Sequence, residues 1–482
     1  MEKSIIALNR YWFVIFVVSF LFFLFLYSFD YNPAFLSNNS LFNTRRKPNH
    51  DPKSNETHPI DSCSGRYIYV HRLPPRFNDH VLQNCTSLYR WYDMCPFVGN
   101  SGFGMQLGKS WFATNQFLLE VIFRNRMNQY DCLTDDSSLA SAIFVPSYCG
   151  LDLGRYLWDY NASVRDTLSL DLVRWLAKQP QWKRMSGRDH FFVAGRISWD
   201  FRRDINNDEG WGSVLMSLPE SMNMTMLTIE SNSWTNEFAI PYPTHFHPST
   251  DSEVIQWQET VRKHKRKYLF SFAGAPRPLL SDSIRSQIID QCVASERLCK
   301  LLDCNSGPNK CDSPVEVLKL FQDSIFCLQP PGDSYTRRST FDSILTGCIP
   351  VFFHPGSAYA QYFWYFPKNY TKYSVFIPGY QVKNASISIN ETLLQFSDEQ
   401  IMDMREEVIK LIPKVIYADP SSKLETIEDA FDIAVKGVLE RVEKVRREIK
   451  EGRDPGIAFA VGNSWKLKLS GTGLENDLDF FF

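Results

Sequence analysis

Short apolar runs alternate with amphipathic helical segments along this chain, and this alternation constrains its fold more than any other feature of the sequence. The runs are rich in aromatic and β-branched residues, as buried strands are, whereas segments such as residues 114–127 repeat apolar side chains at the helical period. Strands that alternate with helices form parallel sheets covered by helices. The expected strands lie within residues 65–74, 138–148, 188–196, 265–274, 323–330 and 348–353.

A proline-rich stretch, residues 237–250, interrupts the alternation and is expected to be a rigid connection between two domains. We expect an N-terminal α/β domain over residues 63–245 and a C-terminal α/β domain over residues 246–396. A capping box begins at Ser397, so helices over residues 397–450 are expected, packed across the two domains. Residues 451–482 are expected to form a tail.

Nineteen consecutive residues, 11–29, carry no charge. As a helix, at ~1.5 Å per residue, they would extend roughly 28 Å, about the thickness of a bilayer core. Lys3 and Arg10 precede this run, and basic residues tend to remain cytosolic. We therefore expect residues 1–10 to be a cytosolic tail, 11–29 a transmembrane signal anchor of type II topology, and 30–62 a flexible stem. A cleaved signal peptide is the alternative, but no small-x-small cleavage site precedes Asp30.

All eleven cysteines lie beyond residue 62, where an oxidising lumen permits disulfides, and eight Asn-x-Ser/Thr sequons also follow the apolar run. Cys292, Cys299, Cys304 and Cys311 lack the short C-x-x-C spacing of a zinc site, so two local disulfides are the better interpretation. The odd total leaves at least one free thiol.

The charge balance argues against a nucleic-acid partner. The 52 basic and 54 acidic residues give a formal net charge of -2, so no overall excess attracts nucleic acid or anionic lipid. The basic run at residues 262–267 is expected to be a solvated helix end. Trp199, Trp211 and Trp234 are candidates for stacking on sugar rings, although burial in the core is the more common fate of tryptophan.

Residues 324–355 combine a buried strand, a Pro-Gly loop and the start of a helix, and ligands of α/β proteins collect at such strand ends. Free amides at the helix start, with the guanidinium groups of Arg337 and Arg338, are suited to a pyrophosphate. Ser334 and Thr336 add hydroxyl donors, and Asp342, near the first helical turn, is suited to ribose hydroxyls. In the alternative interpretation the arginines pair with surface carboxylates and Asp342 favours the helix dipole.

Several segments together resemble one family. They are CSGRYIYVHRLPPRFN, ATNQFLLEVIFRNRM, SSLASAIFVPSY, GRDHFFVAGRISWDFRR, IPYPTHFHPSTDSE, YLFSFAGAPRP and QPPGDSYTRRSTFDSILTGCIPVFFHPGSAYAQY. In this order they are similar to the exostosin-related glycosyltransferases and, more narrowly, to the plant xyloglucan galactosyltransferases. The resemblance runs from about residue 63 to about residue 378.

This resemblance implies a GT-B fold, in which two Rossmann-like domains face each other across a cleft. It implies an inverting transfer of galactose from UDP-galactose, bound by the C-terminal domain, to xylosyl side chains of xyloglucan, bound by the N-terminal domain, at the Golgi membrane. The alternatives are another donor, UDP-galacturonic acid or a UDP-pentose, on a different wall polysaccharide, and a non-catalytic homologue that binds glycans or scaffolds other transferases. Assembly with itself or with other Golgi transferases is left open.

No metal or other cofactor is expected. The only Asp-x-Asp is Asp477 and Asp479 in the tail, outside any strand-loop context, so the metal-binding signature of the other large glycosyltransferase fold is missing. Without a metal, fixed cations must neutralise the departing UDP. Arg277, after the expected strand at 265–274, is a further candidate for that role, and Arg285 is interpreted as a surface residue.

An inverting transfer needs a general base near the attacking hydroxyl. Asp200 and Glu230 are the first candidates and Asp152 the next, because each follows an expected strand of the N-terminal domain. Pairing of Asp200 with Arg202 or Arg203, and helix capping by Asp152, are the structural alternatives. Three histidines are not expected to carry the chemistry: His190 is interpreted as structural, and His245 and His247 have metal-like spacing without an evident third ligand.

Overall fold

The computed structural model describes residues 61–232, 234–305, 311 and 313–456. The expected cytosolic tail, the signal anchor at 11–29, nearly all of the stem and most of the C-terminal tail lie outside these residues. Within the described ranges, none of the helices has both the length and the apolar character needed to cross a membrane.

The first sheet contains five parallel strands in the order β1-β4-β5-β6-β7. Its central strands are buried along almost their whole length, which is why they appear in the sequence as continuous apolar runs rather than as alternating ones. The strands are β1 (Ile68–Val70), β4 (Ala142–Phe144), β5 (His190–Ile197), β6 (Thr225–Glu230) and β7 (Glu237–Ala239).

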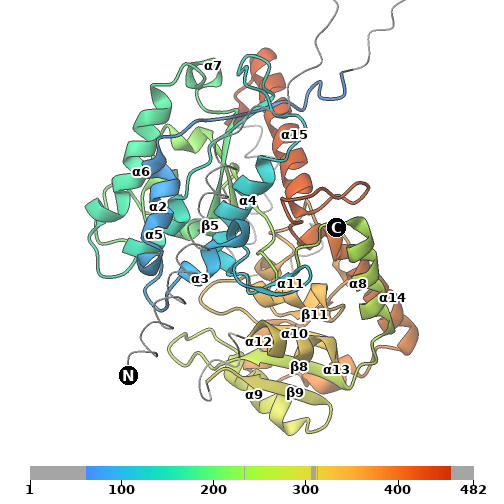
Figure 1. Ribbon diagram of the computed structural model, residues 1–482. Helices are drawn as coiled ribbons and strands as arrows, with labels where there is room; N and C mark the ends of the chain where they lie inside the picture. The colour runs from blue at the N-terminus through green and yellow to red at the C-terminus, as the bar shows by residue number, and fades with distance from the viewer. Residues whose placement is uncertain (1–60, 233, 306–310, 312, 457–482) are drawn as a thin grey trace, which may run out of the picture. The chain divides into compact units, whose positions relative to one another are not determined.

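Helices cover both faces of the first sheet. Phe192 of β5 packs in one hydrophobic cluster with Leu172 of α6 (Ala162–Ala177), whereas Phe191 packs in another with residues of α4 (Leu119–Met127) and α15 (Ala430–Lys450). Figure 1 shows α5 (Cys149–Tyr156) and α6 to one side of β5 and α15 to the other. Shorter helices are α2 (Asp79–Gln83), α3 (Cys95–Val98) and α7 (Trp182–Met185).

The second sheet also contains five parallel strands, in the order β12-β11-β10-β8-β9. The strands are β8 (Tyr268–Gly274), β9 (Cys299–Asp303), β10 (Ser324–Gln329), β11 (Ile349–Phe352) and β12 (Val375–Phe376). From β8 the chain moves outward to β9 and then crosses to β10 on the other side. The carboxyl ends of β8 and β10 therefore form a topological switch point, where α/β sheets bind their ligands. Both sheets confirm the expected parallel α/β class.

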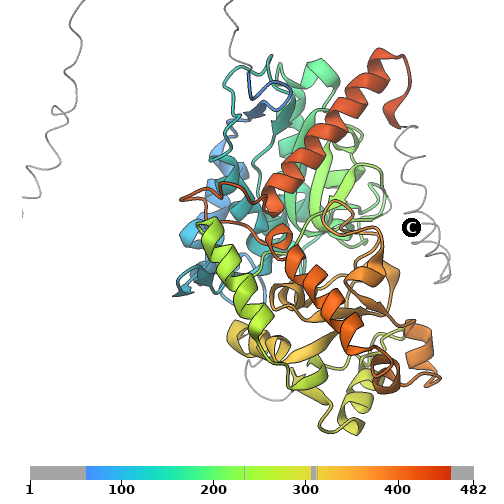
Figure 2. The same cartoon turned by 90° about the vertical axis from the view of Figure 1, so that its right-hand side faces the viewer.

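The connections of the second sheet are helical. They are α9 (Arg285–Ala294), α10 (Pro314–Gln322), α11 (Arg338–Leu345), α12 (Gly379–Lys383) and α13 (Ile389–Leu393), with α8 (Asp251–Lys263) before the sheet and α14 (Asp398–Leu411) after it. A separate antiparallel pair, β2 (Gln106–Gly108) and β3 (Trp111–Phe112), lies outside both sheets. Both views show α14 beside α8, while α15 runs along the first half of the chain (Figures 1 and 2).

The cysteines pair as expected where the sequence made a prediction. Cys292–Cys299 and Cys304–Cys311 are the two local disulfides, and Cys149 is a buried free thiol. Three further disulfides, Cys63–Cys132, Cys85–Cys95 and Cys327–Cys348, were not predicted as pairs.

The basic run at residues 262–267 is only partly a solvated helix end. Arg262 and Lys263 end α8 at the surface, but Arg266 is half-buried and donates hydrogen bonds to the carbonyls of Phe321, Gln322 and Thr346. Desolvation lowers the pKa of its guanidinium to about 9. The expectation was wrong for Arg266, because unpaired carbonyls at the ends of neighbouring elements attract a cation inward.

Candidate active site

The loop of residues 330–337, between β10 and α11, lies at the switch point of the second sheet. Its conformation is held by Arg337, whose Nη1 donates to the carbonyl of Thr336 at 2.8 Å and to Oγ of Ser334 at 3.4 Å. The guanidinium packs over Gly332, where a Cβ would lie 2.0 Å from Nη2. Nη2 itself is buried and has no hydrogen-bond partner among the described residues. The loop thus presents a cation with unused hydrogen-bonding capacity.

Two further arginines converge on this loop. Nε of Arg285 donates to the carbonyl of Pro331 at 3.0 Å, and Nε of Arg277 lies 3.4 Å from Oδ1 of Asp333. Burial, together with the positive charges of Arg337 and Arg277, lowers the pKa of Arg285 to about 10. The interpretation of Arg285 as a surface residue was therefore wrong. Its place at the start of α9 points it inward.

The charges around this loop do not balance. Arg277, Arg285 and Arg337 lie together, and the carboxylate paired with them is that of Asp333, which is largely exposed. Three guanidinium groups outnumber the two carboxylates at the loop, the exposed Asp333 and the buried Glu230. This excess favours an anion with several oxygens, because such a ligand accepts paired N–H bonds. In the alternative interpretation of the sequence, Arg337 pairs with a surface carboxylate. Among the described residues, Arg337 instead bonds Ser334 and Thr336.

Glu230, at the end of β6 in the first sheet, binds the same loop. Its Oε2 accepts hydrogen bonds from the backbone N of Thr336 at 2.7 Å and from Oγ1 of Thr336 at 2.6 Å. Oγ1 also lies 3.0 Å from the hydroxyl of Tyr242. Glu230 is buried, so these bonds are shielded from water. The structure therefore places this candidate base as a support of the 330–337 loop.

Arg338 and Asp342 point to a different side of α11. Arg338 donates to the carbonyl of Thr114 at 2.7 Å and contacts Nε2 of His245, and its Nε lies 3.6 Å from Oδ2 of Asp342. The sequence predicted Asp342 near the first turn of α11, but the residue lies in the second turn. Burial raises its pKa to about 6, and the charge of Arg338 opposes this.

Arg338 and Asp342 line a pocket of about 540 Å³, a volume in the range of small-ligand sites. It opens between residues 92–97 and 113–116 of the first half and the carboxyl ends of β8 and β9 with the starts of α10 and α11. Oδ1 of Asp342 is buried and accepts no hydrogen bond from the described residues. Arg337 thus belongs to the 330–337 loop, whereas Arg338 lines the pocket. Their adjacency in the sequence did not indicate this difference.

Asp200 lies in a short 3-10 helix directly after β5. Its Oδ2 accepts a hydrogen bond from Nε of Arg196 at 2.7 Å and its Oδ1 one from Nε1 of Trp211 at 2.7 Å. The expected alternative partners are engaged elsewhere, Arg202 with Glu237 and Arg203 with Asp166. A carboxylate has more acceptor positions than these two bonds use, so Asp200 can still accept a further proton or hydrogen bond.

Asp152 lies within the first turn of α5 and does not cap that helix. Burial raises its pKa to about 6, with Nη1 of Arg155 at 4.0 Å. Arg155 in turn donates to the carbonyls of Val81 and Asn84, at and after the end of α2. Asp152 is thus linked to α2 through Arg155.

The three histidines have protein partners. Nδ1 of His190 bonds Asp189 at 2.8 Å, and Nε2 lies 3.1 Å from Nε2 of His71, as a structural histidine would. His245 contacts Arg338 and the carbonyl of Phe112, and His247 contacts Thr114 and the carbonyl of Tyr417. Among the described residues, no group of three or more His, Cys, Asp or Glu side chains is arranged to hold a metal ion.

The sequence did not indicate two aromatic side chains of the site. Tyr335 stacks on His354 with ring centroids 4.2 Å apart, and this contact holds the 330–337 loop against the segment that follows β11. The ring of Tyr89 packs against those of Tyr92 and Trp158. Burial raises its pKa, and the charge of Tyr92 adds to the rise. Tyr89 occurs in a loop rich in aromatic residues, and Tyr335 is the one aromatic residue of the 330–337 loop.

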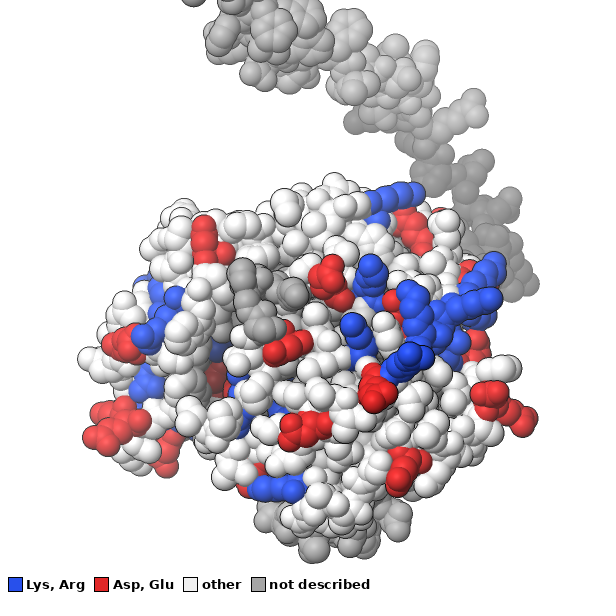
Figure 3. Space-filling view, turned by 90° about the horizontal axis from the view of Figure 1, so that it is seen from below, with Lys and Arg blue, Asp and Glu red and all other residues white. Residues whose placement is uncertain are grey.

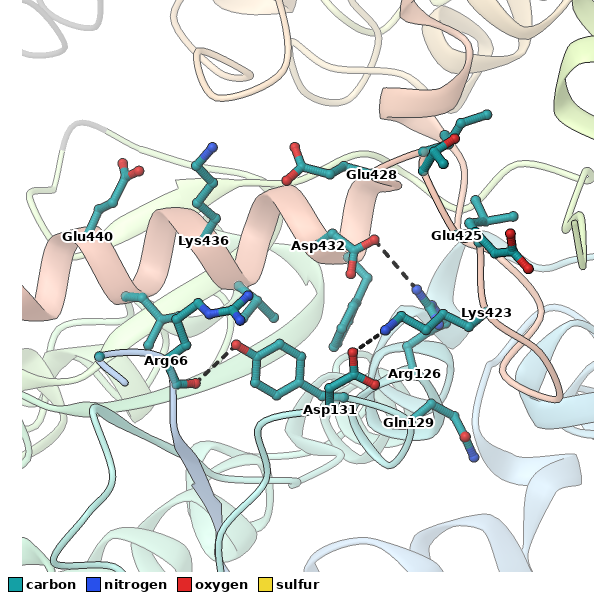
Figure 4. A pocket seen from close by; sticks show the side chains of 18 of the residues that line it. Arg66, Arg126, Gln129, Asp131, Lys423, Glu425, Glu428, Asp432, Lys436 and Glu440 are labelled. Atoms are coloured by element: carbon teal, nitrogen blue, oxygen red, sulfur yellow. Dashed lines mark hydrogen bonds and ion pairs between the residues drawn. The ribbon is translucent and has the colours of Figure 1, made fainter. Parts of the chain in front are cut away.

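Another pocket, of about 790 Å³, lies elsewhere. Figure 4 shows its wall formed by α15, with Asp432 turned toward Arg126 and Lys423 toward Asp131. Its lining includes none of the predicted site residues. Size alone therefore does not identify the active site here.

Fold and site define an α/β protein with a loop at the switch point of a parallel sheet around which three arginines gather. Residues 62–393 match the family model of the exostosin GT47 domain. The chain therefore belongs to the exostosin GT47 family of glycosyltransferases, and it is an enzyme of that class.

Relatives from Arabidopsis thaliana cover most of the chain. "Probable xyloglucan galactosyltransferase GT12" is 54% identical over 436 residues, 87% of this chain and 85% of the relative. "Xyloglucan galactosyltransferase MUR3" is 56% identical over 418 residues, 85% of this chain and 67% of the relative. A solved structure of S. aureus TarM overlaps 56% of this chain and 58% of that chain with a TM-score of 0.31 and 10% identity, too low to support a conclusion.

Proposed function

We propose that this enzyme transfers galactose from UDP-galactose to xylosyl side chains of xyloglucan, with inversion at the anomeric carbon. The observation that carries the proposal is the cluster of Arg277, Arg285 and Arg337 around the 330–337 loop, beside the pocket that contains Asp342. The acceptor and the sugar follow from the relatives named as xyloglucan galactosyltransferases, which are more than half identical over most of the chain. The domains facing across a cleft belong to the same proposal.

In this proposal the diphosphate of the donor lies against the 330–337 loop. Nη2 of Arg337, buried without a partner, and the hydroxyl of Ser334 face that position. The arginine charges stabilise the negative charge that develops on UDP as the sugar leaves, which is the role a divalent cation plays in other transferases. Turnover without a metal follows from this assignment.

The uridine then occupies the 540 Å³ pocket. The free Oδ1 of Asp342 accepts a hydrogen bond from a ribose hydroxyl, and Arg338 holds the other carboxylate oxygen in place. Leaving a buried carboxylate oxygen without a donor costs free energy, so a ligand that supplies the donor gains affinity. Arg338 acts here as a positioning residue between the two halves of the chain.

Asp200 is the general base in this scheme. Arg196 and Trp211 fix its carboxylate, and its charge acts on Tyr89, on which the charge of Asp333 in the 330–337 loop also acts. An acceptor hydroxyl between Asp200 and the donor would give up its proton as the glycosidic bond forms. Glu230 supports the loop through Thr336, and Asp152 is less suited because it faces α2.

We further propose that the enzyme acts in the Golgi lumen, held by the apolar run at residues 11–29. Five disulfides among the described residues support an oxidising compartment. On the face in Figure 3 acidic side chains lie among the basic ones, although Lys and Arg gather at one side. With a net charge of -2, this distribution suits a neutral polysaccharide rather than nucleic acid.

A donor-by-acceptor screen tests the proposal. The lumenal part is incubated with UDP-galactose, UDP-galacturonic acid or UDP-pentoses, and with xyloglucan or other wall polysaccharides, and the product linkages are determined. Galactose in β-linkage on xylosyl residues is the expected product. Faster transfer of galacturonic acid or a pentose would replace the donor assignment. Binding of glycans without transfer or hydrolysis of any UDP-sugar would contradict the catalytic assignment.

A further inference from the structure

Four aromatic side chains form one cluster on the first half of the chain. Trp158 is at its centre, with ring centroids 5.7 Å from Tyr89, 6.1 Å from Trp91 and 6.0 Å from Trp211, each in an edge-to-face arrangement. Trp91 is 63% exposed and Trp211 is 41% exposed. Large exposed rings in contact with one another mark a binding surface, because isolated exposed rings are normal but contiguous ones are not. We call Tyr89, Trp91, Trp158 and Trp211 the aromatic platform.

The loops that carry the platform are held firmly. Tyr89 and Trp91 lie in the loop closed by the Cys85–Cys95 disulfide, and Arg90 of the same loop pairs with Asp159, next to Trp158. Trp211 precedes Gly212, whose φ of +80° and close approach to the carbonyl of Asp200 leave no space for a Cβ. Rings fixed in this way lose little conformational entropy when a ligand binds.

The chemistry of the platform suits an uncharged ligand with apolar faces. The cations beside it are already paired, Arg90 with Asp159 and Arg196 with Asp200. The guanidinium of Arg196 also lies 5.8 Å from the ring of Trp158, which uses its charge within the protein. A sugar ring presents C–H groups on its face and hydroxyl groups at its edge, and indole and phenol rings combine an apolar body with a polar edge in the same way.

The platform continues into the proposed catalytic site. Nε1 of Trp211 donates to Oδ1 of Asp200 at 2.7 Å, so one ring of the platform holds the proposed base. At the other side, the ring of Tyr89 lies 4.8 Å from that of Tyr92, which lines the 540 Å³ pocket together with Asp342. A chain lying on the platform therefore reaches the place where acceptor hydroxyl and donor would meet.

Two other exposed tryptophans do not join the platform. Trp199 is 60% exposed and Trp234 is 47% exposed, so the expectation of burial in the core was wrong for both, as it was for Trp211. Trp234 lies under the guanidinium of Arg202 at 4.4 Å, in a separate contact. Exposure alone therefore does not define the platform; the ring-to-ring contacts around Trp158 do.

We propose that the aromatic platform binds the uncharged β-linked glucan backbone of the acceptor polysaccharide, and that Trp91 is a determinant of acceptor affinity. This proposal rests on the proposed function, since it names the surface on which that acceptor lies. The rings hold the backbone by stacking, and the side chain to be extended is thereby presented to Asp200.

Affinity electrophoresis tests the platform without turnover. The lumenal part is run in native gels that contain xyloglucan, hydroxyethylcellulose, which has the glucan backbone without xylose, or polygalacturonate, which is charged. The variants are Trp91→Ala, Trp91→Phe and, as a control, Tyr380→Ala, which removes a 49% exposed ring from α12. UDP affinity and melting temperature are measured for each, because Trp91 is exposed and its replacement should leave both unchanged.

We expect both glucans, and not polygalacturonate, to retard the parent. Trp91→Ala should weaken retention at least about tenfold, about 1.4 kcal/mol, Trp91→Phe should restore part of it, and Tyr380→Ala should behave as the parent. Equal retention of Trp91→Ala and the parent, or no retention of the parent by either glucan, would overturn the proposal.

The outcome is separable from that of the donor-by-acceptor screen. If no galactose reaches xyloglucan, the proposed function fails, yet retention by hydroxyethylcellulose that depends on Trp91 still supports a glucan-binding platform. If transfer proceeds with an unchanged acceptor KM in Trp91→Ala, the platform assignment fails while the function stands.

Discussion

Replacing Gly332 with alanine should displace the guanidinium of Arg337 while leaving the fold intact. An added Cβ would lie 2.0 Å from Nη2 and 2.6 Å from both Cζ and Nε of Arg337. An ordinary contact between such atoms is about 3.5 Å, so the guanidinium must move by about 1.5 Å. A hydrogen bond of 2.8 Å, such as that from Nη1 to the carbonyl of Thr336, does not survive a shift of that size.

The displaced guanidinium would lose its bonds to the donor diphosphate as well. Each charge-assisted hydrogen bond contributes ~1.5–3 kcal/mol, so UDP affinity should fall about ten- to a hundredfold. Stability should change little, because Gly332 does not use the left-handed backbone region and the atoms it meets end a flexible side chain. Alanine should even lower the entropy of the unfolded chain slightly.

The assay is UDP binding by calorimetry, with initial rates and the melting temperature. Gly108→Ala is the matched control, since a Cβ at that position has no atom within 4 Å. If Gly332→Ala binds UDP as tightly as Gly108→Ala does, Arg337 does not hold the diphosphate and the assignment of the 330–337 loop is refuted. A large fall in melting temperature would instead show that the loop is structural.

Three further outcomes are expected. Arg285→Ala should reduce kcat/KM about tenfold or more, and Arg285→Lys should recover only part of the loss, as steady-state rates would show, because lysine lacks the planar fork. UDP affinity should rise as pH increases through about 6, where Asp342 ionises. Asp342→Asn should reduce this dependence in calorimetry and leave the part that comes from the terminal phosphate of UDP, whose second pKa is also about 6. Since its folded-state pKa lies above the unfolded value of about 3.9, Asp342 also lowers the free energy of unfolding as pH rises through that interval. EDTA should leave initial rates unchanged; loss of activity that Mn²⁺ restores would contradict the role given to the arginines.

Local pattern was sufficient to predict β1, β4, β5, β8, β10 and β11 and the position of the site loop, but not β9 or β12. It was wrong for β7, which lies within residues 237–250, the stretch expected to connect the two domains. Buried parallel strands are continuous apolar runs, and the strand, Pro-Gly loop and helix of residues 324–355 mark their own boundaries. The Cys292–Cys299 and Cys304–Cys311 disulfides were predictable for the same reason, because each closes a short local loop.

Contacts between distant residues were not predictable in this way. Glu230 and Thr336 are 106 positions apart, and Arg338 and His245 are 93 apart. Neither pair leaves a periodic signal, since hydrophobic period describes which face of an element is buried and not what a polar side chain at its end meets. Arg337 and Arg338 separate at the start of α11, because Arg337 is the N-cap residue with an extended backbone and Arg338 is the first residue of the helix.

These distant contacts make the site depend on both halves of the chain. The 330–337 loop belongs to the second sheet, yet Glu230 of the first sheet accepts two hydrogen bonds from Thr336, and Arg338 donates to Thr114. Any relative movement of the two sheets must therefore carry the loop with it or break buried bonds of a carboxylate. Because breaking such bonds leaves a buried charge unpaired, the first alternative is favoured. The first sheet, which is followed by the proposed base, thus also positions the loop that holds the proposed donor. The contact between Glu230 and Thr336 sets the position of the loop relative to that sheet.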